Sequence, residues 1–328
     1  MTTEHGRKDM VRCRGRRSGS RLSLVPDKPA AEVIIDRQLV QGLLEAQFAA
    51  AAGLELSHAA DGWDCSVWRL GDRLAVRLPR RAVAAPLVRH EQQWLPAIAD
   101  RIRPTGLEVP APVFAGAPTD AYPWSWSIVP WIDGKPGLDV PRPQRGAWTE
   151  PLAAALEALH RPAPEDYPRN PFRGVPLVER ADAVRQRIDH LWGTMDATAL
   201  ESLSSAWDEG IAVPPWAAPP VWVHGDLHPG NLIASGQRLA GIIDFGDVTA
   251  GDPAYDLSVA WLAFDPPARA VFIEACGERV DAATWTRARA WAAAVTLMLL
   301  TQSDDNPPYE ALGWECLTEF LPTQAPST

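Results

Sequence analysis

Lysine is the scarcest charged residue of this 328-residue chain, with only Lys8, Lys28 and Lys135 against 28 arginines. Cysteine is also rare, since only four occur, widely spaced and without a Cys-x-x-Cys pair. That spacing excludes a disulfide framework and the usual zinc sites, and it favours a reducing, cytoplasmic setting. No uninterrupted apolar run is long enough to span a bilayer, so we expect no membrane segment.

Two nucleotide-binding fingerprints are missing as well. Gly134-Lys135 is followed by Pro136 in place of Ser or Thr, and it lacks the upstream glycine of a P-loop. No Gly-x-Gly-x-x-Gly sequence follows a predicted strand. The P-loop and dinucleotide-binding classes are therefore excluded.

Charge is unevenly distributed along the chain. The formal net charge is -10, but residues 1–28 hold eight basic and three acidic side chains, so the remainder carries -15. Because the chain beyond residue 28 is this acidic, we do not expect it to bind nucleic acid. We expect residues 1–29 to form a disordered basic tail, because Arg12, Arg14, Arg16 and Arg17 stand among Gly and Ser without the apolar stretch of a secretory signal.

The length favours two lobes, and alternating apolar residues predict that the first, residues 30–135, is a five-stranded antiparallel sheet with one helix. Hairpin turns are predicted at Asp61–Asp64 and at Gly71-Asp72. Helical spacing of apolar residues predicts the helix over about Pro86–Ala99. The predicted strands are Leu54–Ala60, Cys65–Leu70, Arg73–Pro79, Pro112–Ala115 and Ser125–Ile132.

The second lobe, residues 136–328, is predicted to be mostly helical. A Pro-rich stretch that ends at Pro143 is typical of a linker between the lobes. Apolar residues at helical spacing then predict helices over Trp148–His160, Leu177–Leu191 and Ala197–Glu209. The predicted fold class is thus α+β with two lobes.

One carboxylate is expected to point inward from the helix of the small lobe. Glu91 shares the apolar stripe of that helix with Leu87 and Leu95. A buried carboxylate is costly unless it is paired, and Arg77, on the sheet face opposite Val76, is the nearest candidate partner. A purely structural ion pair remains an alternative to a functional one.

The most informative stretch reads H-G-D-L-H-P-G-N at positions 224–231 and I-I-D-F-G-D at positions 242–247. The predicted hairpin between them brings Asp226, Asn231 and Asp244 together. Carboxylate and amide oxygens are ligands that Mg²⁺ prefers. Phosphoryl transfer needs metal ions on the phosphates and a group that orients and deprotonates the attacking hydroxyl. The alternative is a polar loop whose Asp and Asn only cap helices.

Together with G-D-P-A-Y-D-L-S at positions 251–258, these motifs resemble the catalytic core of the aminoglycoside phosphotransferase and choline kinase family. The resemblance runs from about Gly62 to Trp261, most of the chain. It implies a bilobal protein-kinase-like fold, with a small antiparallel-sheet N-lobe that binds ATP or GTP with Mg²⁺. A larger, mostly helical C-lobe would carry the catalytic loop and the acceptor site.

The resemblance also implies roles for single residues. Asp226 would be the catalytic base, and Asn231 and Asp244 would hold Mg²⁺. Asp256 would brace the catalytic loop through its backbone amides, and His224 would pack beneath that loop.

In the small lobe, Arg77 stands where most kinase-like enzymes place a lysine on the α- and β-phosphates, with Glu91 as its partner. Arginine differs from lysine here, because its charge is spread over a planar guanidinium group, whereas the lysine charge sits on one compact ammonium group. The Pro130 carbonyl and the Ile132 N–H would bond the nucleotide base at the hinge. Cys65 follows the turn that resembles the phosphate-covering loop, at a position where the family has Asn.

Two other functions are alternatives to a kinase. The spacing of His224, Asp226 and His228 is compatible with a metallophosphoesterase, but no histidine follows His228 in the chain. A nucleotide-binding pseudokinase is disfavoured because the base and both metal ligands are present. His160 and His228 are interpreted as packing or capping residues.

The acceptor is expected to be a small molecule that carries a hydroxyl group. From Asp247 onward the chain has twelve acidic residues and four arginines, which favours a cationic acceptor held by Asp304, Asp305 and Glu310. An aminoglycoside or macrolide antibiotic fits this best, with antibiotic resistance as the outcome, and choline or a sugar is the alternative. The acidic helices could instead serve solubility alone. We expect a monomer or a homodimer.

Overall fold

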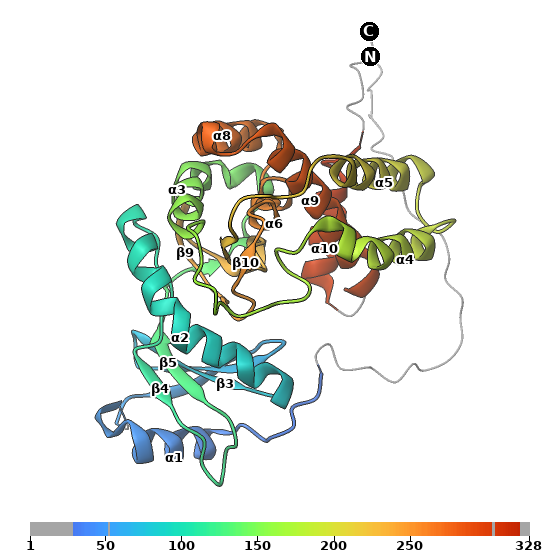
Figure 1. The fold of residues 1–328 in the computed structure, drawn as a ribbon. Coiled ribbons are helices and arrows are strands. Elements are labelled where there is room, and N and C mark those ends of the chain that lie inside the picture. Colours follow the sequence, from blue (N-terminus) through green and yellow to red (C-terminus); the bar gives the residue numbers. More distant parts are fainter. Residues whose placement is uncertain (1–28, 52, 304–305, 322–328) are drawn as a thin grey trace, which may run out of the picture.

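The structure is a computed structural model that describes residues 29–51, 53–303 and 306–321. The predicted disordered tail, except for Pro29, and the predicted acceptor residues Asp304 and Asp305 lie outside these ranges. Figure 1 shows a small lobe built on a sheet and a larger lobe built mostly from helices. The predicted bilobal α+β fold class is confirmed.

The sheet of the small lobe has five antiparallel strands, as the sequence predicts, and the structure places them in the order β1-β2-β3-β5-β4. Gly71 has a φ of 59° in the turn between β2 and β3, a left-handed conformation that favours glycine. Alternation in β3 buries Val76 and Leu78 on one face and turns Arg77 to the other. The strands are β1 (Leu56–Asp61), β2 (Cys65–Leu70), β3 (Leu74–Pro79), β4 (Phe114–Gly116) and β5 (Trp126–Pro130).

A helix that the sequence analysis did not predict, α1 (Arg37–Gln47), covers the outer face of this sheet. The expectation of a single helix in the small lobe was therefore wrong. Asp36 caps α1 by accepting a hydrogen bond from the Leu39 N–H at 2.9 Å. Val40 and Leu43 are buried in one apolar cluster with residues of the sheet, so α1 closes the core of the small lobe.

The helix α2 (Ala85–Ile102) lies on the other side of the sheet, toward the large lobe (Figure 1). The C-terminal half of α2 packs against the large lobe. Leu95, Ile98 and Ile102 are buried in the same apolar cluster as the helices of that lobe. Trp94 packs against Trp222, with 5.1 Å between the ring centroids.

Besides α2, backbone pairing joins the lobes at two places among the described residues. The chain crosses once, through residues 131–134, into β6 (Lys135–Pro136), which pairs with β8 (Leu232–Ser235) of the large lobe. Glu108 makes the second junction, because its backbone N–H donates to Ala240 O at 2.9 Å and its carbonyl accepts from the Ile242 N–H at 3.0 Å. Both junctions hold the small lobe against the hairpin that follows the catalytic loop.

The large lobe is mostly helical, as predicted. The helix α9 is buried along most of its length and packs most extensively against α5 and α10. The predicted helix over Leu177–Leu191 begins instead with a 3₁₀ turn at Leu177–Arg180. Within the described residues, no helix is long and apolar enough to cross a membrane. The helices are α3 (Thr149–Leu159), α4 (Ala181–Leu191), α5 (Ala197–Ala212), α6 (Ala254–Leu257), α7 (Val259–Ala263), α8 (Pro266–Cys276), α9 (Ala282–Gln302) and α10 (Pro307–Leu317), and the remaining strands are β7 (Val221–Val223), β9 (Arg238–Ile242) and β10 (Thr249–Gly251).

The Pro-rich segment after β6, which has the composition of a linker, is packed into the large lobe. Arg142 and Arg145 are 5% and 2% exposed, and both donate hydrogen bonds to backbone carbonyls at the end of α7. Both also form ion pairs with Glu315 of α10, and Arg142 forms a further one with Glu319. The buried guanidinium groups therefore fix this segment to α7 and α10.

Candidate active site

The loop between β7 and β8 is organised by a buried histidine. His224 is fully buried, and its Nδ1 accepts a hydrogen bond from the Asp226 N–H at 3.1 Å. The neutral ring then carries its proton on Nε2, which donates to Ile243 O at 2.9 Å. His224 therefore joins the catalytic loop to the segment that precedes Asp244, and neither ring nitrogen is left to bind a metal.

Asp256 of α6 holds the same loop from its other side. Its buried carboxylate accepts hydrogen bonds from the backbone N–H groups of His224 at 2.7 Å and of Gly225 at 3.1 Å. His160, at the end of α3, lies 3.2 Å from the same carboxylate. Gly225 has a φ of 86°, and a Cβ there would lie 2.3 Å from Asp247 O, so only glycine fits.

Asp226 projects from this braced loop, with its side chain 29% exposed. Asn231 donates to Asp226 Oδ2 at 3.2 Å, and His228 Nε2 lies 3.3 Å from the same oxygen. Arg173 pairs with Asp226 Oδ1 at 3.3 Å. Burial alone would raise the pKa of Asp226, but His228 and Arg173 hold that pKa below its ordinary value. The carboxylate is therefore ionised and can accept a hydrogen bond from a hydroxyl group.

Asn231 and Asp244 offer the oxygen atoms that suit a magnesium ion. The Asn231 amide nitrogen donates to Asp226 O at 2.8 Å, which leaves the amide oxygen for a ligand. Asp244 is 55% exposed and has a φ of 63°, a left-handed conformation that Asp tolerates better than most residues. An amide oxygen and an exposed carboxylate are hard donors, so the residues present fit Mg²⁺.

Arg77 links the small lobe to this site. Its Nη1 lies 2.6 Å from Glu91 Oε1, and its Nη2 lies 3.1 Å from Asp244 Oδ1. Burial lowers the pKa of Arg77, but Glu91 and Asp244 together raise it above the ordinary value. The guanidinium is therefore charged and lies beside a candidate metal ligand.

The predicted hinge residues lie at the end of β5. The Trp131 N–H donates to Arg73 O at 2.8 Å. Because carbonyls alternate in direction along an antiparallel strand, the Pro130 carbonyl points away from β3. Ile132 is buried at 7% exposure just beyond the strand. The Pro130 carbonyl is thus free of the β3 ladder, as a base-binding group must be.

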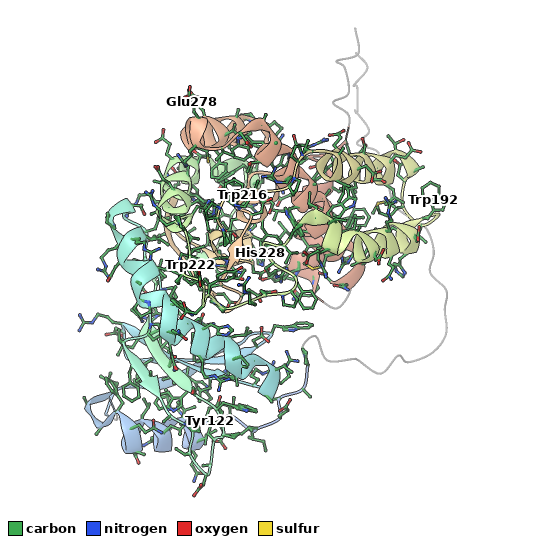
Figure 2. All side chains as sticks on the ribbon, in the orientation of Figure 1. Tyr122, Trp192, Trp216, Trp222, His228 and Glu278 are labelled. Carbon is green, nitrogen blue, oxygen red and sulfur yellow. The ribbon has the colours of Figure 1, made fainter. Side chains whose placement is uncertain are left out.

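Several residues of the site carry no signal that the sequence analysis used. Arg173, from the segment between α3 and α4, pairs with Asp226 and also with Asp247, at 3.3 Å in each case. Asn170 donates to Asp247 at 2.9 Å. Tyr309 of α10 packs its ring against His228, 5.3 Å between centroids. Figure 2 shows His228 in the half of the large lobe that lies toward the small lobe.

The acidic C-terminal region is only partly available to an acceptor. Glu310 is exposed in the first turn of α10. Glu315 pairs with arginines of the segment after β6, and Glu319 pairs with Arg142 and with Arg269 of α8. These two carboxylates therefore contribute to packing.

The order of these motifs along the chain has a counterpart among known proteins. Residues 55–291 match the phosphotransferase enzyme family. The chain belongs to this family. That membership confirms the predicted resemblance, and it supports the prediction of an enzyme with an alcohol group as acceptor.

Individual relatives of this phosphotransferase share only about 30% of their residues with it, over part of their length. The homoserine kinase of Acidiphilium cryptum (strain JF-5) is 30% identical over 209 residues, which cover 60% of each protein. The homoserine kinase of Nitrobacter hamburgensis is 29% identical over 124 residues, 35% of each protein. The chain thus matches less than two thirds of the length of these curated relatives.

Solved structures of similar fold include antibiotic phosphotransferases. The GDP and kanamycin complex of APH(2")-IIia has a TM-score of 0.64 and 19% identity, and the match covers 86% of this chain and 98% of that one. Macrolide 2'-phosphotransferase MphH from Brachybacterium faecium has a TM-score of 0.55 and 19% identity, with 88% and 98% covered. At this identity the likeness establishes the kinase-like fold.

Proposed function

We propose that this phosphotransferase is a small-molecule kinase that transfers the γ-phosphate of ATP or GTP to a hydroxyl group. Residues 30–135 would bind the nucleotide, and residues 136–328 would carry the catalytic loop and the acceptor. Two sets of contacts, one across the lobes and one on the catalytic loop, carry the proposal. Glu91 pairs with Arg77, Arg77 pairs with Asp244, and on the catalytic loop Asn231 bonds Asp226.

Each residue has a task in this reaction. Asp226 orients the acceptor hydroxyl and takes its proton while the oxygen–phosphorus bond forms and the bond from the γ-phosphorus to the β-phosphate oxygen breaks. Arg77 holds the nucleotide phosphates. Asn231 and Asp244 would hold Mg²⁺, which, when bound, neutralises the charge of the phosphates. His224 and Asp256 keep the loop that carries Asp226 in place.

Replacing Arg77 should separate phosphate binding from packing. We expect Arg77→Lys to raise the nucleotide KM by a few-fold and Arg77→Ala to raise it by about tenfold or more, because a charge-assisted contact contributes about 1.5–3 kcal/mol. Initial rates at varied nucleotide concentration measure this. Arg89→Ala, an exposed arginine of α2, is the matched control. Equal KM values for Arg77→Ala and the unchanged protein would assign the Arg77–Glu91 pair to structure alone.

An antibiotic of the aminoglycoside or macrolide type is the first candidate acceptor. Structural neighbours in complex with kanamycin, or named for macrolides, support it, as does the acidic C-terminal region. Phosphorylation of the antibiotic in the cytoplasm would then make the cell resistant to it.

A small hydroxylated metabolite is the second candidate acceptor. Both of the curated relatives described above are named homoserine kinases. Choline and sugars belong to the same class of small acceptors.

A panel of acceptors tests the proposed function directly. Aminoglycosides, macrolides, choline, sugars and hydroxy amino acids are incubated with Mg²⁺ and either ATP or GTP, and nucleotide consumption and product mass are measured. We expect one class to gain the mass of a phosphoryl group at the expense of the nucleotide. Phosphate-ester hydrolysis without a nucleotide, or nucleotide binding without turnover of any acceptor, would contradict the kinase proposal.

A further inference from the structure

Two arginines, one just before α4 and one within it, have no acidic partner among the described residues. Arg180 ends the 3₁₀ turn that precedes α4, and Arg187 lies seven residues later in α4. Seven residues are about two helical turns, so both side chains leave the same face of the helix. Within residues 29–51, 53–303 and 306–321, neither guanidinium has an ion pair.

Arg187 is the more constrained of the two. Its Nε is buried and has no hydrogen-bond partner among the described residues. Burial lowers the pKa of Arg187, and the nearby charges of Arg180 and Arg173 lower it further. A buried donor without an acceptor is costly. Arg142 also has a buried Nε without a hydrogen-bond partner, but its Nη atoms are bonded to carbonyls, whereas no hydrogen bond is found for the Arg187 guanidinium among the described residues.

Other arginines of the large lobe behave differently. Arg185, on the same helix, reaches Asp208 at 3.7 Å, and Arg289 of α9 pairs with Glu209 at 2.8 Å. The buried Arg142 and Arg287 each pair with a carboxylate. Arg161, Arg169 and Arg238 also form no ion pair with the described residues, but their side chains are exposed, whereas Arg180 and Arg187 are half-buried.

The position of the two arginines connects them to the candidate active site. Arg173, which lies close enough to affect the pKa of Arg187, pairs directly with Asp226. Arg180 stacks over the Phe172 ring at 4.9 Å, next to Arg173 in sequence. A hollow of about 250 Å³ opens beside Arg187, between α4 and the end of α9, with Gln186, His190, Thr301 and Gln302 among its walls. There is room there for a small polar group.

We propose that Arg180 and Arg187 bind an oxyanion of the acceptor, a carboxylate or a phosphate ester. The acceptor is then an alcohol that carries a negatively charged group. The guanidinium groups of Arg180 and Arg187 bind that charged group, and the hydroxyl of the acceptor faces Asp226. This inference rests on the proposed kinase function, and of the two candidate acceptors it favours the small hydroxylated metabolite, in an anionic or zwitterionic form, over a polycationic antibiotic.

Matched acceptor pairs test the inference through turnover. L-serine with L-serinamide and 4-hydroxybutyrate with its amide probe a carboxylate, and glucose 6-phosphate with glucose probes a phosphate ester. We expect the charged member of one pair to have the higher kcat/KM. The double variant Arg180→Gln/Arg187→Gln should reduce that preference by about tenfold to a hundredfold, because contacts to charged groups have this magnitude. Arg185→Gln, on the exposed face of α4, should leave it unchanged.

Anion binding gives a second measurement that needs no turnover. Acetate and inorganic phosphate are titrated by calorimetry into the full chain saturated with Mg²⁺ and a non-hydrolysable nucleotide. We expect binding that the double variant loses and Arg185→Gln retains. Equal anion affinity in the double variant, no binding by the unchanged protein, or equal kcat/KM within every acceptor pair would overturn the inference. If no acceptor reacts but the anion binds at these arginines, the kinase proposal fails and the anion site stands.

Discussion

Asp226→Asn is expected to lower kcat by about 10²–10⁴-fold, the usual contribution of a general base. Asparagine keeps the shape of the side chain but cannot take the proton of the acceptor hydroxyl. Nucleotide affinity should change little, because Asp226 is bonded within its own loop and lies opposite Arg173, not Arg77. Initial rates with the best acceptor of the panel, together with calorimetry of Mg-nucleotide binding, measure the two quantities separately.

Asp244→Asn provides the contrast to this result. Asparagine also tolerates the left-handed backbone of position 244, so the change removes one charge without adding strain. We expect it to weaken Mg-nucleotide binding by about tenfold or more and to abolish the difference between titrations with Mg²⁺ and with chelator. Asp120→Asn, which changes an exposed residue of the small lobe, is the control for both variants.

A near-normal kcat for Asp226→Asn at saturating acceptor would refute the assignment of Asp226 as the base.

Asp252→Ala is expected to destabilise the fold by about 3–5 kcal/mol, a large share of the 5–15 kcal/mol typical of a protein. Asp252 and Arg287 form an ion pair of 2.6 Å with side chains 6% and 5% exposed. Removal of the carboxylate leaves a buried guanidinium without its counter-charge. Chemical denaturation, followed by tryptophan fluorescence, measures the loss.

A matched control for this variant uses the partner of another arginine of α9. Glu209→Ala removes the partner of Arg289 in α9, an ion pair whose side chains are 53% and 34% exposed. Solvent screens such a pair, so its loss should cost at most about 1 kcal/mol. Similar losses in the two variants would show that burial does not determine the contribution of these pairs.

The sheet could be predicted from the sequence because its signals are local. Alternating residues in Arg73–Pro79 and the turn at Gly71 are enough to place β3 and its hairpin. The helix α1 carried a similar signal that was not used, an N-capping Asp36 followed by apolar residues at Val40 and Leu43. The helix α1 is therefore predictable from its own sequence.

Other features depend on contacts between distant segments. Arg173 lies 53 residues before Asp226, and nothing around it in sequence indicates that its guanidinium reaches the catalytic loop. The segment with Arg142 has the composition of a linker and becomes a packed element only because carbonyls of α7 and carboxylates near the C-terminus accept its hydrogen bonds. Periodicity and turn composition cannot report such pairings.

The placement of α2 has a consequence for how the protein unfolds. The helix precedes the crossing between the lobes, yet Leu95, Ile98 and Ile102 fill the apolar core of the large lobe. A fragment that begins at residue 136 would lack this part of its own interior, and a fragment that ends there would expose it to water. The core of the large lobe is therefore incomplete without α2, and we expect its unfolding to be coupled to that of the small lobe.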